Sequence, residues 1–169
     1  MIHSSGQILT GRAAKVIENA ISNVPDKDGF FKTAYKAVCV PEVIPTEASE
    51  VYGTWIEEGA EGKHLSFVGV VGNDTTPEAN LDAGTTVLNS RKPILDYGAS
   101  RTLQKGDVVT IERNGMISVI ASEKVKEGEL ITLGANGGFK PTKVAEESLG
   151  RAYQSAEEGE RFIAYIKGV

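Results

Sequence analysis

Acidic residues are the side chains best suited to chemistry in this sequence, but they are scattered. Asp82-Ala83-Gly84-Thr85 contains the acid and glycine of the turn that carries a catalytic carboxylate in aspartic proteases. Ala83 stands where that turn needs a hydroxyl residue, and such a dyad also needs two like turns facing each other. The acids Glu57, Glu58 and Glu61 could supply the carboxylate pair of a glycosidase. Clustered acids in a glycine-rich turn are more often solvated, so neither pattern predicts an enzyme.

Phosphate, metal and nucleophile motifs are also incomplete. The glycine-rich run 134–138 could form a nest for an anion, but it has no Gly-Lys-Ser/Thr ending and favours a hairpin turn. Asp74 and Asp82 lack the spacing of a calcium loop. One cysteine and two histidines cannot build a zinc site of the usual spacing. Cys39 lies in the apolar run 37–40, which predicts a buried thiol. We therefore expect no catalytic activity, cofactor or metal.

The composition also limits the partners that we expect. The 169 residues carry a net charge of -5, and the lysines and arginines occur singly, which argues against nucleic-acid binding. No apolar segment approaches 18 residues, so we expect no membrane span. The first residues lack the basic and apolar regions of a signal peptide, so synthesis in a cytoplasm-like compartment is expected.

Short apolar runs separated by glycine turns predict the elements that must position these residues. Val108–Glu112 and Met116–Ala121 read as strands, and the Asn-Gly pair between them predicts a hairpin. Further strands are predicted at Leu130–Leu133 and Arg161–Ile166, each following a glycine turn. The 19 glycines fit a turn-rich fold. The sequence predicts an all-β fold, a small antiparallel barrel or sandwich of the jelly-roll or β-clip kind, over residues 31–169.

The first 30 residues are predicted to form an arm and a short amphipathic helix. Residues 1–10 are polar and read as an extended arm. Residues 12–23 are predicted to form a helix, with Thr10 as N-cap and Pro25 as a stop. Its apolar stripe is Ala13, Val16, Ile17, Ala20, Ile21 and Val24. Such a helix packs either on its own domain or on a partner chain.

Two further features could take part in binding. Trp55, the only tryptophan, reads as a core or interface anchor, with a sugar-stacking platform as the alternative. The polar stretch from Gly72 to Gly84 reads as a surface loop.

Four motifs of the C-terminal half stand out. They are Gln104-Lys105-Gly106-Asp107-Val108-Val109, Asn114-Gly115, Val125-Lys126-Glu127-Gly128-Glu129-Leu130 and Leu149-Gly150-Arg151-Ala152-Tyr153-Gln154-Ser155-Ala156-Glu157-Glu158-Gly159-Glu160. Together with the strand Phe67–Val71, these motifs resemble those of tailed-phage head decoration proteins, also called capsid cement proteins. The likeness covers about residues 65–169.

This resemblance implies a mechanical function in the virion. Proteins of this kind sit on the outside of the head, commonly as trimers, and bridge major capsid protein subunits. The alternatives are a small ligand- or carbohydrate-binding β module and a trimeric β-fold hydrolase. The residues that the sequence nominates for capsid or subunit contact are Ile2, His3, Ile8, Val16, Ile17, Ala20, Ile21 and Trp55.

Overall fold

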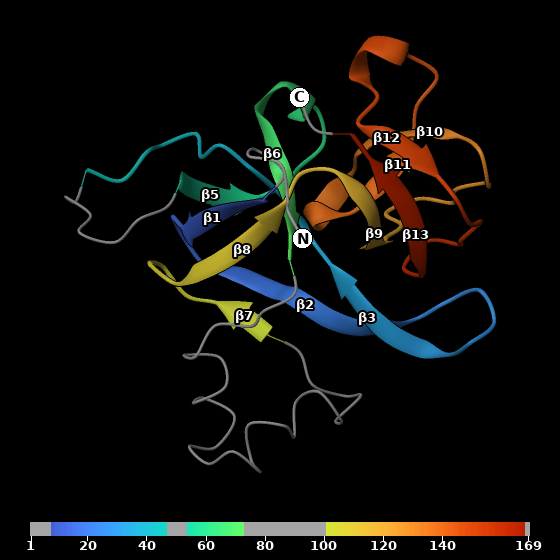
Figure 1. Ribbon diagram of the computed structural model, residues 1–169, viewed down its shortest axis with the longest axis horizontal. Coiled ribbons are helices and arrows are strands. Elements are labelled where there is room, and N and C mark those ends of the chain that lie inside the picture. Colours follow the sequence, from blue (N-terminus) through green and yellow to red (C-terminus); the bar gives the residue numbers. More distant parts are fainter. Residues whose placement is uncertain (1–7, 47–53, 73–100, 168–169) are drawn as a thin grey trace.

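A computed structural model describes residues 8–46, 54–72 and 101–167 of the chain. These residues form thirteen strands in two sheets, with three single-turn 3-10 helices between them (Figure 1). None of the helices in the described ranges is long and apolar enough to cross a membrane. The prediction of an all-β fold is confirmed.

The smaller sheet is a closed five-stranded barrel with the strand order β1, β5, β4, β6 and β8. β1 runs parallel to β5 and antiparallel to β8, and these two pairings close the barrel. The strands of the barrel are β1 (Ile8–Ala13), β4 (Ala37–Cys39), β5 (Thr54–Glu58), β6 (Phe67–Val71) and β8 (Val108–Glu112).

The larger sheet has eight strands in the order β11, β10, β12, β13, β9, β3, β2 and β7. Its pairings are antiparallel except for β3 and β9, which run parallel. Its strands are β2 (Ile17–Pro25), β3 (Phe31–Tyr35), β7 (Arg101–Leu103), β9 (Gly115–Ile120), β10 (Leu130–Leu133), β11 (Phe139–Pro141), β12 (Gly150–Ala152) and β13 (Arg161–Ile166). The single-turn helices are η1 (His64–Ser66), η2 (Ala135–Gly137) and η3 (Ala145–Glu147).

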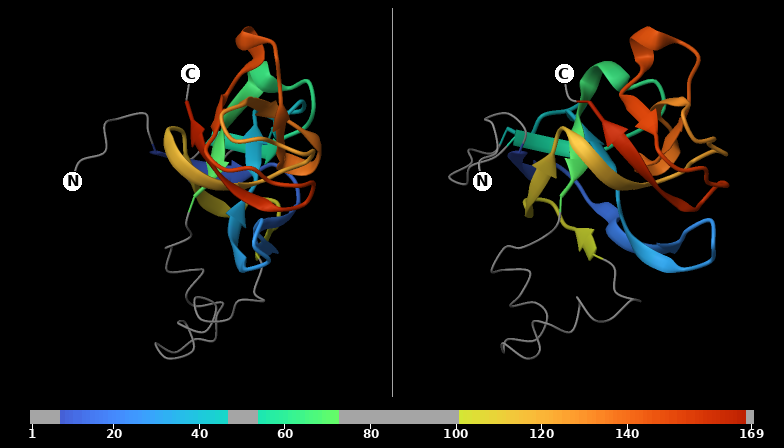
Figure 2. Two further views of the ribbon diagram at one scale, coloured as in Figure 1. Left: turned by 90° about the vertical axis from the view of Figure 1, so that its right-hand side faces the viewer. Right: turned by 45° about the vertical axis from the view of Figure 1, so that its right-hand side comes forward.

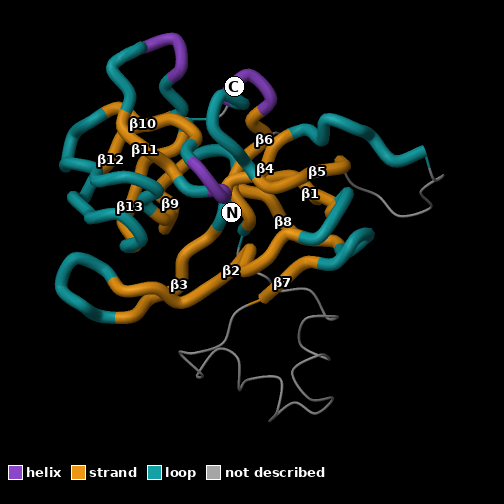
Figure 3. The backbone as a smooth tube through the Cα atoms, turned by 180° about the vertical axis from the view of Figure 1, so that it is seen from behind, coloured by secondary structure: helices purple, strands orange, loops and turns teal. Residues whose placement is uncertain are grey.

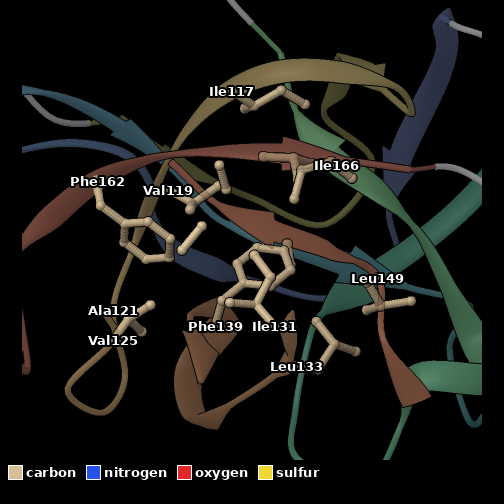
Figure 4. Packing of buried hydrophobic residues seen from close by; sticks show 14 of the residues in the cluster. Ile117, Val119, Ala121, Val125, Ile131, Leu133, Phe139, Leu149, Phe162 and Ile166 are labelled. Carbon is tan, nitrogen blue, oxygen red and sulfur yellow. The ribbon is translucent and has the colours of Figure 1, made fainter. Parts of the chain in front are cut away.

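Two hydrophobic cores share one wall made by β4 and β6. One core contains Ala37 and Cys39, whereas Val38 between them belongs to the other. Likewise Val70 and Val71 point into different cores. Successive side chains of a strand face opposite sides, so a run buried on both faces must be apolar throughout. The larger core gathers residues of β9, β10, β11 and β13 (Figure 4), and Phe67 meets Phe139 edge-on at 6.3 Å between ring centroids.

The helix predicted at residues 12–23 is wrong, because this segment contains the end of β1 and most of β2. Ile17 and Ala20 are both fully buried, three residues apart as on a helix face. The spacing arises from an irregularity in β2, whose register with β7 shifts between Ile17 and Ile21. Asn19 lies inside this shift with a positive φ of 50°. A bulge inserts an extra residue into a strand, so the inward-facing positions there are three apart.

The extended arm predicted for residues 1–10 is wrong for its last three residues. Ile8, Leu9 and Thr10 belong to β1 and pair with Glu112, Ile111 and Thr110 of β8. Residues 1–7 lie outside the described ranges. The polar character of this stretch misled the prediction, because one face of a barrel strand is open to solvent.

The hairpin predicted across Asn114-Gly115 is also wrong, although both strands exist. β8 pairs with β1 and β6 in the barrel, whereas β9 pairs with β13 and β3 in the larger sheet. The turn therefore carries the chain from one sheet to the other. The strands predicted at Leu130–Leu133 and Arg161–Ile166 are confirmed as β10 and β13.

The same type of turn occurs three times, directly before β8, β10 and β13. Before β10, the N–H of Glu129 donates to the carbonyl of Lys126 at 3.1 Å, and its Oε1 accepts the N–H of Lys126 at 2.8 Å. Gly128 has a φ of +90°, which favours glycine. The N–H of Gly128 donates to the carbonyl of Ala152, and the N–H of Ala152 donates to the carbonyl of Glu129. The same hydrogen bonds recur in the turns at residues 104–107 and 157–160, where Ala13 and Ala121 take the place of Ala152.

Candidate interaction surface

The hairpin of β2 and β3 is the most prominent projecting element. Its strands pair from Ile21 and Tyr35 to Pro25 and Phe31. At its base β3 pairs with β9 only at Tyr35 and Val119. Beyond that point the hairpin leaves the sheet, and its turn projects from the molecule (Figures 1 and 2).

Side chains hold the hairpin where the backbone pairing with β9 stops. Arg161 Nε donates to Ser118 Oγ at 2.6 Å, and that hydroxyl donates to the carbonyl of Thr33 at 2.6 Å. Thr33 Oγ1 also donates to Asn23 Oδ1 across the hairpin at 3.1 Å. This relay ties β13, β9 and β3 together, so the projecting hairpin is anchored at its base.

The turn of the hairpin is organised by Asp26. Its Oδ1 accepts the N–H groups of Asp28 at 2.9 Å and Phe30 at 3.0 Å, and its Oδ2 lies 3.4 Å from Lys32 Nζ. Burial alone would raise the pKa of the Asp26 carboxyl, but these hydrogen bonds and the Lys32 charge outweigh it and lower the pKa. The carboxylate therefore fixes the backbone that presents Phe30.

Two adjacent aromatic side chains are exposed at the end of this hairpin. Phe30 is 65% exposed and Phe31 is 59% exposed. Pro25, half-buried, is the register partner of Phe31. Exposed aromatic side chains grouped on a projecting element are typical of protein interaction sites. We call Phe30 and Phe31 the tip.

A second exposed apolar region follows β4. Val43 is 81% exposed and Ile44 is 59% exposed. They border an open hollow of about 370 Å³ between this segment, β5 and the turn before β8. The hollow is lined by Ala14, Lys15, Glu42, Val43, Ile44, Pro45, Thr46, Glu57 and Lys105. Apolar side chains therefore share this hollow with charges of both signs.

Glu57 places a fixed negative charge at the hollow. Its side chain is 6% exposed; Lys15 Nζ lies 3.2 Å from Oε2 and Lys63 Nζ 3.4 Å from Oε1. The N–H of Glu42 donates to Oε1 at 3.1 Å. Burial would raise the pKa of Glu57, but the Glu42 N–H and the two ammonium groups together lower it. The buried carboxylate thus remains ionised and paired.

A second, polar hollow of about 470 Å³ lies beside β2 and η2. Lys36 forms an ion pair with Glu58 there, and Asn19 and Asn136 both have positive φ angles, of 50° and 54°. Asparagine adopts this conformation more readily than most residues. The hollow has no aromatic residue among the described residues that line it.

The residues nominated by the sequence are dispersed. Ile17 and Ala20 are core residues and offer no surface, whereas Val16 is 48% exposed and Ile21 is half-buried. Ile8 opens β1. Ile2 and His3 lie outside the described residues, as do residues 73–84 of the predicted surface loop.

Trp55 lies on β5 beside Arg12 of β1. The Arg12 guanidinium carbon lies 4.2 Å from the centroid of the Trp55 ring, a cation–π contact between register partners. This contact covers one face of the ring. A sugar could therefore stack only on the other face of the Trp55 ring.

Other residues with candidate chemistry are occupied in structural contacts. Glu58 pairs with Lys36, and Glu61 lies 3.7 Å from Lys140. Cys39 is fully buried, as predicted, and burial raises the pKa of its thiol to about 11. Among the described residues, no three His, Cys, Asp or Glu side chains group as a metal site requires.

The tip is the feature that sequence reasoning missed. The turn Asp26-Lys27-Asp28-Gly29 is recognisable in the sequence, and the two phenylalanines follow it directly. Apolar residues after a turn are normally the inward face of a strand, so only the structure reveals that these two are exposed.

No family model matches the chain, and no curated protein matches it. Among solved structures, the chain is similar to the head fiber gp8.5 N base of bacteriophage phi29. The identity is 19%, the match covers 94% of this chain and 92% of that chain, and the TM-score is 0.47. At these values, function has to be argued from the residues of this chain.

Proposed function

We propose that this protein is a non-enzymatic decoration protein of a tailed-phage head. It is made in the host cytoplasm, binds the outside of the capsid as a homotrimer and stabilises the head by bridging major capsid protein subunits. The sequence motifs over residues 65–169 support this class of protein. Three of those motifs form one repeated turn, which starts three strands of the rigid body.

The observation that carries the proposal is an anchored β body with a projecting apolar tip. The cores on both sides of the β4–β6 wall make the body rigid, and Phe30 and Phe31 are held away from it. A protein that joins subunits by contact alone needs these two properties: a body that transmits force and exposed apolar groups that a partner can bury. Several copies around one axis add their contacts through multivalency.

The test is binding to phage heads assembled without this protein. We expect saturable co-sedimentation, regularly spaced density on the outer surface by electron microscopy, and a higher temperature of head rupture. Absence of binding at saturating protein, with an unchanged rupture temperature, would contradict the proposal. A melting temperature that rises with added neutral sugars would instead favour the carbohydrate-binding alternative.

A further inference from the structure

We propose that residues 121–129 and 152–160 form a reciprocal clasp, in which the turn of each segment is hydrogen-bonded to the start of the other, so that the two turns open only together. We call these two segments the clasp. The inference goes beyond the proposed function and does not depend on it. It assigns a conformational device to the larger sheet: two strand pairs that hold each other closed.

The two segments of the clasp share a sequence pattern. Each begins with an alanine, Ala121 or Ala152, and ends with the tripeptide Glu-Gly-Glu. Val125 and Ala156 stand at the same position within the two segments. These four apolar side chains are all buried. The two segments therefore carry their buried residues and their turn residues in the same order.

Each turn of the clasp is bonded to the alanine that starts the other segment. The turn at 126–129 bonds to the carbonyl and the N–H of Ala152, at 2.8 and 2.9 Å. The turn at 157–160 bonds in the same way to Ala121, at 2.7 and 2.9 Å. In both turns the glycine N–H donates to the alanine carbonyl, and the carbonyl of the last glutamate accepts the alanine N–H. The hydrogen bonds therefore form two matching pairs that run in opposite directions.

The two segments also bond to each other midway between the turns. The N–H of Val125 donates to the carbonyl of Ala156, and the N–H of Ala156 donates to the carbonyl of Val125, both at 2.9 Å. Each of these residues is donor and acceptor to its counterpart, so an approximate twofold axis relates the two segments. The N–H of Glu127 adds a bond to Ser155 Oγ at 2.9 Å. The central bridge thus connects one turn to the other.

The strands around the clasp follow the same twofold relation. β10 follows the first turn and pairs with β12, which leads into the second segment, whereas β13 follows the second turn and pairs with β9, which leads into the first. Leu130 is the register partner of Arg151, and Arg161 is that of Ile120. β10, β12, β13 and β9 are consecutive in the larger sheet (Figure 3). Each strand pair therefore joins one segment to the other and couples the two turns through the sheet.

The turn before β8 has the same structure without the reciprocity. The turn at 104–107 makes the same two bonds to Ala13, at 2.7 and 2.9 Å, but Ala13 is followed by β2 and not by a turn of this type. Gly106, Gly128 and Gly159 have φ angles of 91°, 90° and 86°. At none of the three does an added Cβ meet an atom within 4 Å beyond the neighbouring residues. Gly106→Ala therefore imposes the same backbone strain outside the clasp and is a matched control.

Amide hydrogen exchange of the full chain, followed by NMR, tests the clasp. In Gly128→Ala, backbone strain weakens the turn at 126–129, so exchange should become about 10-fold faster at the N–H of Ala152. Because the turns open together, the N–H groups of Ala121 and Gly159 should accelerate to the same extent. Gly159→Ala should in turn accelerate the N–H of Ala152.

The control variant decides between coupled and independent opening. Gly106→Ala should accelerate the N–H of Ala13, and its effect on the amides of the clasp measures the contribution of global unfolding. If Gly128→Ala accelerates Ala152 while Ala121 and Gly159 stay at the level of Gly106→Ala, the turns open independently. That result would overturn the inference.

A milder variant repeats the test without backbone strain. Ser155 is exposed, and Ser155→Ala removes only the hydroxyl that accepts the N–H of Glu127. Exchange should become about threefold faster at the N–H groups of both Gly128 and Gly159. Thr142→Ala removes a comparable acceptor, that of the Val144 N–H, outside the clasp and should leave both amides unchanged. Acceleration at Gly128 alone in Ser155→Ala would contradict the clasp.

Discussion

Glu57 combines burial with a charge, and its three partners explain why it stays ionised. Lys15, Lys63 and the N–H of Glu42 converge on its two oxygens. A buried carboxylate without such partners would take up a proton. The same network holds the segment after β4 against β5, and so shapes the hollow beside Val43 and Ile44.

The Glu57→Gln variant should be destabilised at neutral pH by about 1–3 kcal/mol, because hydrogen bonds to a charged group are lost. The folded protein holds the pKa of Glu57 below its ordinary value. The stabilisation from the carboxylate is therefore present above the unfolded-state pKa and is lost as the pH falls through the folded-state pKa. Urea unfolding of both proteins at neutral pH and near about pH 3 checks this. The difference between them should shrink in acid, and a constant difference would contradict the assignment.

Asp26 determines the order of the hairpin turn, so its removal should loosen the tip without unfolding the protein. In Asp26→Ala, the N–H groups of Asp28 and Phe30 lose their acceptor and should exchange with deuterium faster. Exchange in β13 should not change. Asp28→Ala, in the same turn but exposed, is the matched control. Equal exchange in both variants would mean that Asp26 does not organise the turn.

At the scale of elements, the repeated turn is the feature that local sequence determines most directly. The glycine supplies a positive φ, and the acid after it bonds back to the first residue of the turn. Gly128→Ala should therefore destabilise the protein by about 1–2 kcal/mol, since no atom lies near the added methyl group and only backbone strain acts. Chemical denaturation measures this change. Glu127→Ala, one residue earlier, should be nearly neutral.

The assignment of residues 8–13 to β1 changes what we expect when the N-terminal residues are deleted. Deleting residues 1–10 removes Ile8, Leu9 and Thr10, whose pairing with β8 closes the barrel. We expect the melting temperature to fall by about 5 °C or more. Deleting residues 1–7 leaves β1 whole and is the control. Thermal unfolding followed by circular dichroism compares the two, and equal stability of both deletions would show that the start of β1 contributes little.

For the whole molecule, the shared wall predicts a single cooperative unit. Ile111 fills the barrel core and Leu133 the other core, and both are fully buried. Ile111→Ala and Leu133→Ala should each lower the stability by about 2–5 kcal/mol. Because β4 and β6 belong to both cores, each variant should shift one common calorimetric transition. Two separate transitions, with only one moved by each variant, would show that the cores unfold independently.

The sequence by itself determined those structural features that depend only on residues close together in the chain. Glycine followed by an acid fixed the turn at residues 126–129, and the apolar run around Cys39 predicted the buried thiol. The strands β10 and β13 followed from apolar runs bounded by such turns. These features were predictable because the backbone preference and the side-chain pattern that produce them are local.

Tertiary structure alone decided which strands pair and which side chains remain exposed. The Asn-Gly turn could not reveal that β8 and β9 enter different sheets, because their partners β1, β6, β3 and β13 are distant in the sequence. Ile17 and Ala20 have the same spacing on a bulged strand as on a helix, so only the pairing of β2 with β7 distinguishes the two. The exposure of Phe30 and Phe31 likewise depends on where the hairpin leaves β9. Pairing and exposure result from packing between distant segments, and no local pattern records that packing.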